Sequence, residues 1–312
     1  MSLPKTIPQA VLSDYTTFQL GGPCRYLIEC AAPEELIAAV HQLAHENTPF
    51  ILIGGGSNLV VSDLGLDMAV IRYTSDIPLI ERHGNDITVA ASTSLDALAL
   101  ACIEEQLEGL NYTAGIPGTV GGAVVGNAGA WGKQVGDVLK SALILDKQGH
   151  THTVGPDYFA FSYRHSRLKE TDAIIVAVTF ALQPADPVKL AGERAEILKL
   201  RAAKHPDPAT QPCAGSFFRN IEPTSKAEKR QATGWFIEQA GGKTLRAGGA
   251  YIFDKHANII IKGPGCSAQD VHDLHLKMIE IVKEHFNLQL NREVRFVGKF
   301  PNTPGANEQG FW

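Results

Sequence analysis

The feature that most constrains this chain is a glycine-rich run at residues 115–132, GIPGTVGGAVVGNAGAWG. It contains no acidic residue, and the nearest base, Lys133, lies just beyond it. Glycine weakens helices and strands because it loses the most conformational freedom on folding. The run therefore predicts a backbone that approaches a ligand closely and offers N–H groups to it, the alternative being a glycine-packed β structure without a ligand. Its glycines are Gly115, Gly118, Gly121, Gly122, Gly126, Gly129 and Gly132.

Two other residues of the run, and a second glycine cluster, extend this prediction. Pro117 stiffens one turn, and the Asn127 amide offers a donor and an acceptor to the edge of a ring. The cluster Gly54-Gly55-Gly56-Ser57-Asn58 follows the apolar residues 50–53, a setting that suits a nest of backbone N–H groups around a diphosphate. It has neither the Gly-Lys-Ser/Thr of a P-loop nor the G-x-G-x-x-G spacing, and a tight turn is the alternative. Together the two loops suggest one large, phosphate-bearing cofactor held from two sides.

Length and composition narrow the class of protein. A chain of 312 residues predicts two or three compact lobes, and 44% hydrophobic with 20% charged residues is typical of a soluble globular protein. A net charge of −5 argues against nucleic-acid binding, and no apolar run approaches the roughly 20 residues that span a bilayer. We expect no signal peptide and, without H-E-x-x-H or clustered ligands, no metal site. Five cysteines without C-x-x-C favour a reduced, cytoplasmic protein.

Hydrophobic periodicity and capping residues predict alternating helices and strands. Helices are expected at 33–45, after Ser94, at 190–204, around 235–237, and after a capping box formed by Ser267 and Asp270. The tail 301–312 is expected to be loosely ordered. Strands are expected at 26–30, 50–53, 68–72, 87–90, 141–146, 174–180, 250–253 and 258–261.

Three side chains in the later part of the chain are candidates for chemistry. Arg164, which follows Tyr163, could bind a carboxylate through two parallel hydrogen bonds, although a surface ion pair is the alternative. Ser216 precedes two aromatic residues and could donate a proton in a dry pocket, or simply begin a strand. Alternation places Glu293 and Arg295 on one face of a strand, where a solvated ion pair is the default interpretation.

Seven motifs in order resemble the UDP-N-acetylenolpyruvoylglucosamine reductase family, FAD enzymes that complete UDP-N-acetylmuramate in peptidoglycan synthesis. The resemblance implies an α+β fold: a two-lobed FAD-binding domain of the vanillyl-alcohol-oxidase (PCMH) type and a smaller α+β substrate-binding domain. We place these domains at 1–184, with a lobe boundary near 75, and at 185–312, with the extreme C-terminus packing back on the first lobe. The motifs are TFQLGG at 17–22, LIGGGSNL at 52–59, GIPGTVGGA at 115–123, NAGA at 127–130, YR at 163–164, GSFF at 215–218 and EVRF at 293–296.

The resemblance also implies roles for individual residues. In the family, a hydride passes from flavin N5 to the enolpyruvyl methylene carbon, and NADPH reduces the non-covalently bound FAD. Arg164 matches the arginine that stabilises the developing negative charge, Glu293 its acidic partner, and Ser216 the residue that protonates the carbanion or enol. FAD would be held by Gly54, Gly55, Gly56, Ser57 and Asn58 at its diphosphate, and by Gly115, Gly118, Thr119, Gly121, Gly122, Asn127, Ala128 and Gly129 along the diphosphate and isoalloxazine.

On the substrate side, Arg201, Lys204 and Asn220 resemble positions that contact the nucleotide diphosphate or sugar, and Tyr163 is expected beside them. The UDP-sugar is then the only partner that we expect, with no nucleic acid or membrane, for a cytoplasmic monomer. The short segment between residues 164 and 216 resembles the subclass that lacks an extra tyrosine-bearing substrate loop, and residues 222–233 resemble a polar insertion. The chain departs from the family pattern at Arg292, at 124–126 and after Asn220, where a proline is often found.

Two rival functions follow from the same residues. An FAD oxidase of the same superfamily would need a base near the flavin and often a covalent histidine or cysteine, and none stands out in the glycine loops. A non-catalytic flavin- or UDP-sugar-binding protein would not need Arg164, Ser216 and Glu293 together.

Overall fold

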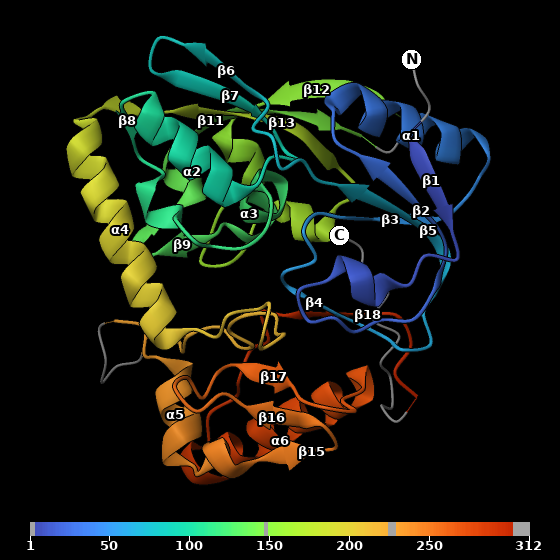
Figure 1. Cartoon of the computed structure of the whole chain (residues 1–312), viewed down its shortest axis with the longest axis vertical. Helices are drawn as coiled ribbons and strands as arrows, with labels where there is room; N and C mark the ends of the chain where they lie inside the picture. Colours follow the sequence, from blue (N-terminus) through green and yellow to red (C-terminus); the bar gives the residue numbers. More distant parts are fainter. Residues whose placement is uncertain (1–3, 147–148, 224–228, 302–312) are drawn as a thin grey trace.

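The first lobe is a small mixed sheet covered by one helix. The computed structural model describes residues 4–146, 149–223 and 229–301 (Figure 1). The strand order is β1-β2-β5-β3, with β1 antiparallel to β2 and the other pairs parallel. Helix α1 connects β2 to β3, and these two strands lie on either side of β5 and run parallel to it. The elements are β1 (Lys5–Pro8), η1 (Leu12–Tyr15), β2 (Cys24–Cys30), α1 (Pro33–His45), β3 (Phe50–Ile53), β4 (Leu59–Val61) and β5 (Leu66–Tyr73).

The second lobe is a five-stranded antiparallel sheet of order β12-β11-β13-β7-β6, with α2 and α3 beside it. The chain passes from the first sheet to the second between Tyr73 and Ile80. Its elements are β6 (Ile80–His83), β7 (Asp86–Ala90), α2 (Leu95–Glu104), β8 (Leu107–Glu108), η2 (Asn111–Thr113), α3 (Val120–Gly126), β9 (Gly129–Ala130), β10 (Lys133–Gln134), η3 (Val135–Asp137), β11 (Leu139–Leu145), β12 (Thr151–Val154), η4 (Pro156–Phe159), η5 (Arg167–Glu170), β13 (Ile174–Ala181) and β14 (Gln183–Pro184).

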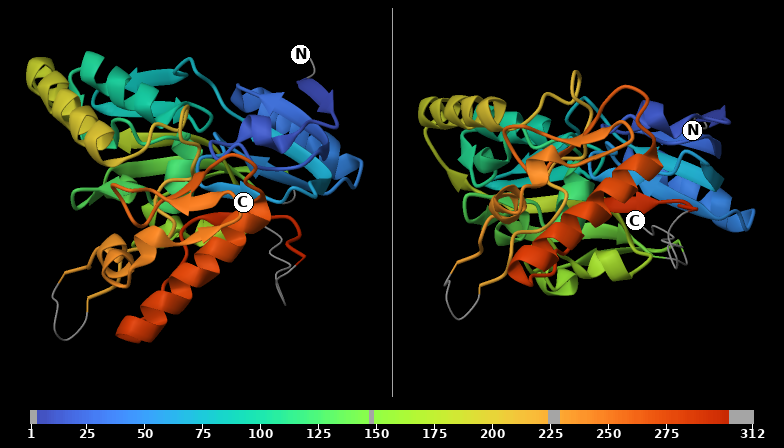
Figure 2. Two further views of the ribbon diagram at one scale, coloured as in Figure 1. Left: turned by 60° about the horizontal axis from the view of Figure 1, so that its bottom comes forward. Right: turned by 90° about the horizontal axis from the view of Figure 1, so that it is seen from below.

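The C-terminal unit is a three-stranded antiparallel sheet, β15-β16-β17, packed against α5 and the long helix α6 (Figures 1 and 2). Helix α4 runs down the side of the second lobe toward this unit, and it packs on α2 and η2. The predicted domain boundary at 184 lies just before this helix and stays a prediction. The elements are α4 (Pro187–Lys204), α5 (Thr233–Gln239), η6 (Gly242–Thr244), β15 (Arg246–Ala247), β16 (Ala250–Ile252), β17 (Ile260–Lys262), α6 (Ala268–Phe286) and β18 (Arg295–Val297).

The C-terminal unit is joined to the first lobe through a shared core and a shared strand pair. Phe18 and Val60 of the first lobe are fully buried in the same hydrophobic cluster as Phe217, Phe296 and the apolar face of α6. Strand β18 pairs in parallel with β4, so the end of the described chain returns to the first lobe. The predicted packing of the extreme C-terminus concerns residues 302–312, which lie outside the described residues, as does part of the 222–233 insertion.

Local signals located the helix starts well. The Ser94 hydroxyl accepts from the Ala97 amide, and Ser267 and Asp270 form the predicted capping box. Helix α4 begins at Pro187, three residues earlier than predicted, because the Asp186 carboxylate caps the Val188 amide at 2.9 Å. The predicted strand at 258–261 begins later, at Ile260, because the Asn258 side chain bonds the backbone of Phe218 instead.

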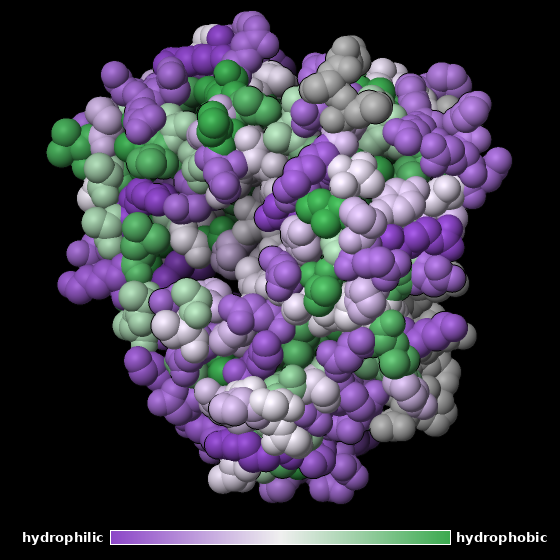
Figure 3. All heavy atoms as spheres, turned by 45° about the vertical axis from the view of Figure 1, so that its right-hand side comes forward, coloured by the Kyte–Doolittle hydropathy of each residue, from purple (hydrophilic) through white to green (hydrophobic). Residues whose placement is uncertain are grey.

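Other sequence expectations concern the surface and the thiols. All five cysteines are free, as predicted, and all five are buried. Among the described helices, none is both long and apolar enough to cross a bilayer. The exposed face in Figure 3 is mostly hydrophilic, with hydrophobic residues scattered in small groups.

Candidate active site

Most of the predicted site residues line one cavity. The cavity has a volume of about 590 Å³, within the usual range for a ligand site, and both lobes and the C-terminal unit contribute to it. The predicted residues that line it are Gly54, Gly55, Gly56, Ser57, Asn58, Gly118, Thr119, Gly121, Gly122, Ala128, Gly129, Arg164, Arg201, Lys204, Ser216 and Glu293. Four predicted residues are not part of this lining: Gly115, Asn127, Tyr163 and Asn220.

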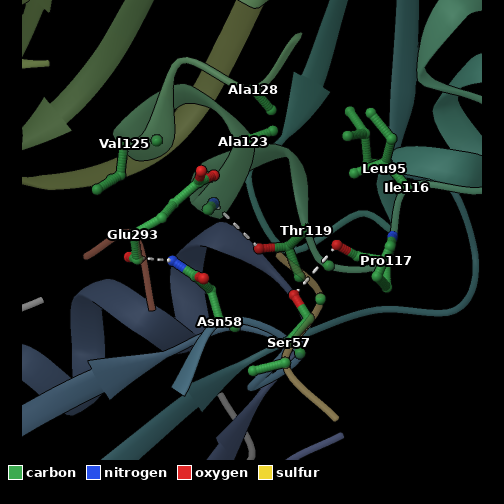
Figure 4. Close-up of a pocket in the computed structure, with 18 of the residues that line it drawn as sticks. Ser57, Asn58, Leu95, Ile116, Pro117, Thr119, Ala123, Val125, Ala128 and Glu293 are labelled. Atoms are coloured by element: carbon green, nitrogen blue, oxygen red, sulfur yellow. Dashed lines mark hydrogen bonds between the residues drawn. The ribbon is translucent and has the colours of Figure 1, made fainter. Parts of the chain in front are cut away.

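The two glycine loops meet and form a continuous wall of the cavity. The Ser57 hydroxyl donates to the Pro117 carbonyl at 3.1 Å (Figure 4). A Cβ on Gly54 would lie 2.5 Å from the Thr119 hydroxyl, and one on Gly118 would lie 2.8 Å from the Ser57 hydroxyl. A side chain at either position would force Thr119 or Ser57 to shift, and at Gly118 the φ of +119° adds backbone strain, so glycine is favoured where the loops touch.

The run at 115–132 is not a loop throughout, because its centre forms helix α3. The helix begins at the N-cap Thr119, whose hydroxyl accepts from the Gly122 amide at 3.2 Å. The amides of Val120 and Gly121 donate to carbonyls of the β7–α2 connection. The first amides of α3 are therefore already bonded inside the protein, and its glycines serve mainly to keep side chains out of the cavity and its walls.

The triple-glycine loop fits a diphosphate better. Within the described residues, the amides of Gly55, Gly56, Ser57 and Asn58 donate no hydrogen bond to another part of the protein. Gly56 has φ of +62°, and a Cβ there would lie 2.3 Å from the Tyr15 carbonyl oxygen. A turn with unused amides and no side chain at its bend matches the nest that phosphate oxygens need.

Asn127 and Gly115, both predicted to bind FAD, make hydrogen bonds inside the protein. Asn127 is fully buried, and both amide hydrogens of its side chain are used, toward Gln134 Oε1 at 3.0 Å and the Ser162 carbonyl at 2.9 Å. It thereby fixes the Ser162–His165 turn rather than meeting the edge of a ring. The Gly115 amide donates to Asp96 at 2.7 Å, behind the cavity wall.

The predicted pair Arg164 and Glu293 is present. Arg164 Nε lies 3.1 Å from Glu293 Oε1, the two side chains being 23% and 22% exposed, and its Nη2 donates to the Gly129 carbonyl at 2.6 Å. Burial raises the pKa of Glu293, and the nearby charges of Arg164, Lys169 and Arg219 oppose that rise. This is a partly buried, oriented ion pair inside the cavity and not the solvated pair of the alternative interpretation.

Backbone bonds bring Ser216 close to this pair. The Glu293 amide donates to the carbonyl of Phe217, the residue after Ser216, at 2.9 Å, and the Phe217 amide donates to the Asn258 carbonyl at 2.8 Å. The segments that carry Ser216 and Glu293 are therefore neighbours. Asn58 continues the connection, because its Nδ2 donates to the Glu293 carbonyl at 3.1 Å (Figure 4). The loop predicted to bind the diphosphate thus also holds the backbone of Glu293.

Arg201 and Lys204 lie in the last turn of α4 and line the same cavity. Arg201 Nε and Nη2 are buried without a hydrogen-bond partner, and the guanidinium lies 5.1 Å from the ring centroid of Trp131. Burial lowers the pKa of Arg201, and Asp96 opposes that change. Because buried donors without acceptors are costly, these two nitrogen atoms point to an anionic ligand.

Tyr163 and Asn220 form a contact between units beside the cavity. The Asn220 amide donates to the Tyr163 hydroxyl at 3.4 Å, and the Arg230 guanidinium lies 4.0 Å from the Tyr163 ring centroid. The Asn220 side chain accepts from the Thr233 amide at 3.3 Å, at the base of the polar insertion. Lys169, Trp131 and Arg295 also line the cavity. The sequence did not predict Lys169 and Trp131 as lining residues, because no local pattern marks them.

Comparisons with known proteins agree with this geometry. Residues 24–155 match the family described as FAD binding domain, and residues 207–297 match the C-terminal domain of UDP-N-acetylenolpyruvoylglucosamine reductase. Over 94% of its length the chain is 36% identical to UDP-N-acetylenolpyruvoylglucosamine reductase 2 of Symbiobacterium thermophilum, of which the alignment covers 92%. The chain belongs to the UDP-N-acetylenolpyruvoylglucosamine reductase family.

Other members of the reductase family are similar over nearly their full length. The enzyme of Lactiplantibacillus plantarum is 35% identical over 92% of both chains. The crystal structure of the reductase from Thermus caldophilus superposes with a TM-score of 0.75 at 29% identity, over 95% of this chain and 99% of that one. Membership confirms the predicted α+β fold, with an FAD-binding domain of the vanillyl-alcohol-oxidase type and a smaller C-terminal domain.

Proposed function

We propose that this chain reduces the enolpyruvyl group of UDP-N-acetylglucosamine enolpyruvate to give UDP-N-acetylmuramate, with FAD as cofactor and NADPH as reductant. One observation carries the proposal: Arg164, Ser216 and Glu293, brought from distant parts of the sequence, line a single cavity with the glycine loops. Family membership supports the same activity.

The cavity fits FAD because glycines form much of its wall, and because the turn at 55–58 has unused amides. We assign the diphosphate to this turn and the ring system to the wall around Gly118, Ala128 and Gly129. FAD, when bound, supplies the hydride chemistry. The protein contributes orientation, charge and a proton.

The polar side chains of the cavity would handle the charge that develops on the substrate. Arg164 binds the enolpyruvyl carboxylate and stabilises negative charge as it grows, because a preformed cation in a partly buried site needs no reorganisation. Glu293 keeps the guanidinium in place through the 3.1 Å contact. Ser216 delivers a proton from its hydroxyl to the substrate carbon next to the carboxylate.

The other end of the substrate would lie at α4. The two unpartnered nitrogen atoms of Arg201, with Lys204 beside them, provide donors for a diphosphate. The segment from 165 to 215 holds only η5, β13, β14, α4 and short connections, which supports the subclass without an extra substrate loop. We further propose that the protein is a cytoplasmic monomer that binds no nucleic acid, in line with its net charge of −5.

The flavin itself provides the test. Purified protein is expected to be yellow, to be bleached by NADPH without oxygen, and to regain its colour when UDP-N-acetylglucosamine enolpyruvate is added. A colourless protein that takes up no FAD would refute the proposal. Reoxidation by oxygen alone, with no effect of the enolpyruvyl substrate, would favour an oxidase.

A further inference from the structure

Lys169 is a charged residue of the cavity to which no role has been given so far. It lies on η5, five residues after Arg164, and lines the cavity. Its Nζ donates to the backbone carbonyl of Arg164 at 2.7 Å. The Lys169 side chain is half-buried, and a lysine in such a position is usually paired, as this one is with the carbonyl.

The bond of Lys169 is made to a strained residue. Arg164 has φ of +55°, in the left-handed region that a long side chain rarely adopts. Such a conformation persists only where the surroundings hold it, and strained residues gather at functional sites. The Arg164 guanidinium is held by Gly129 and Glu293, while Lys169 holds its backbone.

Lys169 also belongs to a cluster of charges around one carboxylate. Burial lowers the pKa of Lys169 to about 8, with Arg219, Arg295 and Arg164 acting in the same direction and Glu293 opposing them. Arg164 lies before η5, Arg219 follows Ser216, and Arg295 begins β18 two residues after Glu293. A lysine with a pKa of about 8 loses its charge in mildly alkaline solution, whereas an arginine keeps its charge there.

We propose that Lys169 is a positioning residue for recognition of the substrate carboxylate: by fixing the Arg164 backbone, it directs the guanidinium toward that group. This inference rests on the proposed function. It concerns the lactyl or enolpyruvyl carboxylate alone, because Lys169 acts through Arg164 and not through the α4 groups assigned to the diphosphate.

Two ligands separate this role from a general structural one. UDP-N-acetylmuramate carries the carboxylate, and UDP-N-acetylglucosamine lacks it. Titration calorimetry on the FAD-loaded protein would compare Lys169→Met, Lys169→Arg and the unaltered chain. In Lys169→Met we expect affinity for UDP-N-acetylmuramate to fall about tenfold, because one charge-assisted hydrogen bond to the Arg164 backbone is lost. Affinity of Lys169→Met for UDP-N-acetylglucosamine should stay within about twofold of that of the unaltered chain. Lys169→Arg should bind UDP-N-acetylmuramate as tightly as the unaltered chain does. Lys140→Met, at an exposed lysine paired with Asp86 outside the cavity lining, is the matched control.

The pH dependence gives a second readout. In the unaltered protein, affinity for UDP-N-acetylmuramate should decline above about pH 8 as Lys169 loses its proton, and Lys169→Arg should lose this decline. Equal weakening of both ligands by Lys169→Met, or no weakening of either, would overturn the proposal. If Lys169→Met does not fold, the pH comparison with Lys169→Arg decides. Failure of the unaltered protein to bind FAD or either nucleotide would instead refute the proposed function.

Discussion

At the scale of single residues, the site depends on side chains that gain their properties from neighbours. Arg164 and Glu293 are both partly buried, and each limits the other's freedom through the 3.1 Å contact. Ser216 would be a poor acid in water, and it becomes useful only where a strongly basic carbon is held within reach. The chemistry of each residue is therefore testable by a substitution that leaves its neighbours in place.

Replacing Ser216 with alanine should separate the two half-reactions. Bleaching of the flavin by NADPH should be nearly unchanged, because the serine has no part in it. Turnover of the enolpyruvyl substrate should fall by about a hundredfold or more, the usual contribution of a positioned proton donor. Stopped-flow absorbance measures both steps on one sample. Normal turnover in Ser216→Ala would show that the proton comes from another group.

At the scale of elements, glycine decides how closely the two cofactor loops approach. Gly118 has φ of +119°, and a Cβ there would lie 2.8 Å from the Ser57 hydroxyl. Gly192, in the middle of the exposed face of α4, has nothing within 4 Å of a Cβ. The same substitution should therefore have opposite effects at these two sites.

Gly118→Ala should weaken FAD binding about tenfold, since left-handed backbone costs a non-glycine residue about 1–2 kcal/mol and Ser57 must move as well. Gly192→Ala, the matched control, should leave FAD binding unchanged and stabilise the fold by about 0.5–1 kcal/mol. Flavin fluorescence titration and urea unfolding are the measurements. Undiminished FAD affinity in Gly118→Ala would contradict the close contact between the loops.

A second element-scale prediction concerns the attachment of α4 to α2. Asp96 accepts two bonds from Arg194, at 2.8 and 2.7 Å, and another from the Gly115 amide. We expect Asp96→Asn to lower the free energy of unfolding by about 1–2 kcal/mol at pH 7. This value is at the low end for hydrogen bonds to charged groups, because the Asp96 side chain is 40% exposed and solvent weakens the interaction.

The pH dependence of that penalty follows from the pKa of Asp96. Burial tends to raise this pKa, but the hydrogen bonds from Arg194 and Gly115 lower it overall. A lowered folded pKa gives stability that is present above the unfolded value of about 3.9 and is lost as pH falls. The difference between Asp96→Asn and the unaltered protein should therefore shrink below about pH 4. A difference that persists unchanged in acid would contradict the ionic character of this contact.

At the scale of the whole molecule, the C-terminal core is also the junction with the first lobe. It includes Phe18 and Val60 from the first lobe and a group of aromatic rings around His275. Burial lowers the pKa of His275 to about 3. In the unfolded chain His275 is protonated below about pH 6.5, whereas in the folded protein it stays neutral down to about pH 3. The free energy of unfolding therefore falls as pH drops through this interval.

Acid unfolding should reveal this effect. Between about pH 6.5 and 4 the excluded proton costs about 1.4 kcal/mol per pH unit, and His205, whose pKa burial lowers to about 4, acts in the same direction. His275→Phe should reduce the slope by about one proton, and its stability at pH 8 gives the combined effect of changed packing and of the lost bond to the His272 carbonyl. Urea unfolding across pH provides the slope. An unchanged slope would show that His275 is protonated in the folded protein.

The parts of the fold and site that were predictable are those set by interactions between residues close together in the sequence. Residues 33–45 and 268–286 were predictable because capping and apolar spacing act within one or two turns. The motif at 17–22 was part of the family resemblance, but its physical purpose was not. Phe18 fills the C-terminal core, and the Thr17 hydroxyl donates to the Cys213 carbonyl at 2.8 Å. Contacts across such separations leave no periodic signal in sequence.

The sequence alone determined the glycine loops, most helices and strands, and the chemical identities of Arg164, Ser216 and Glu293, because these follow from residue type and short spacing. Tertiary structure decided that the two loops meet in one wall, that α3 forms inside the glycine run, and that Asn127 is a structural residue. It also brought the Lys169 ammonium group to the backbone carbonyl of Arg164. Each of these facts depends on which distant surfaces pack together, and close packing is a property of the folded chain as a whole.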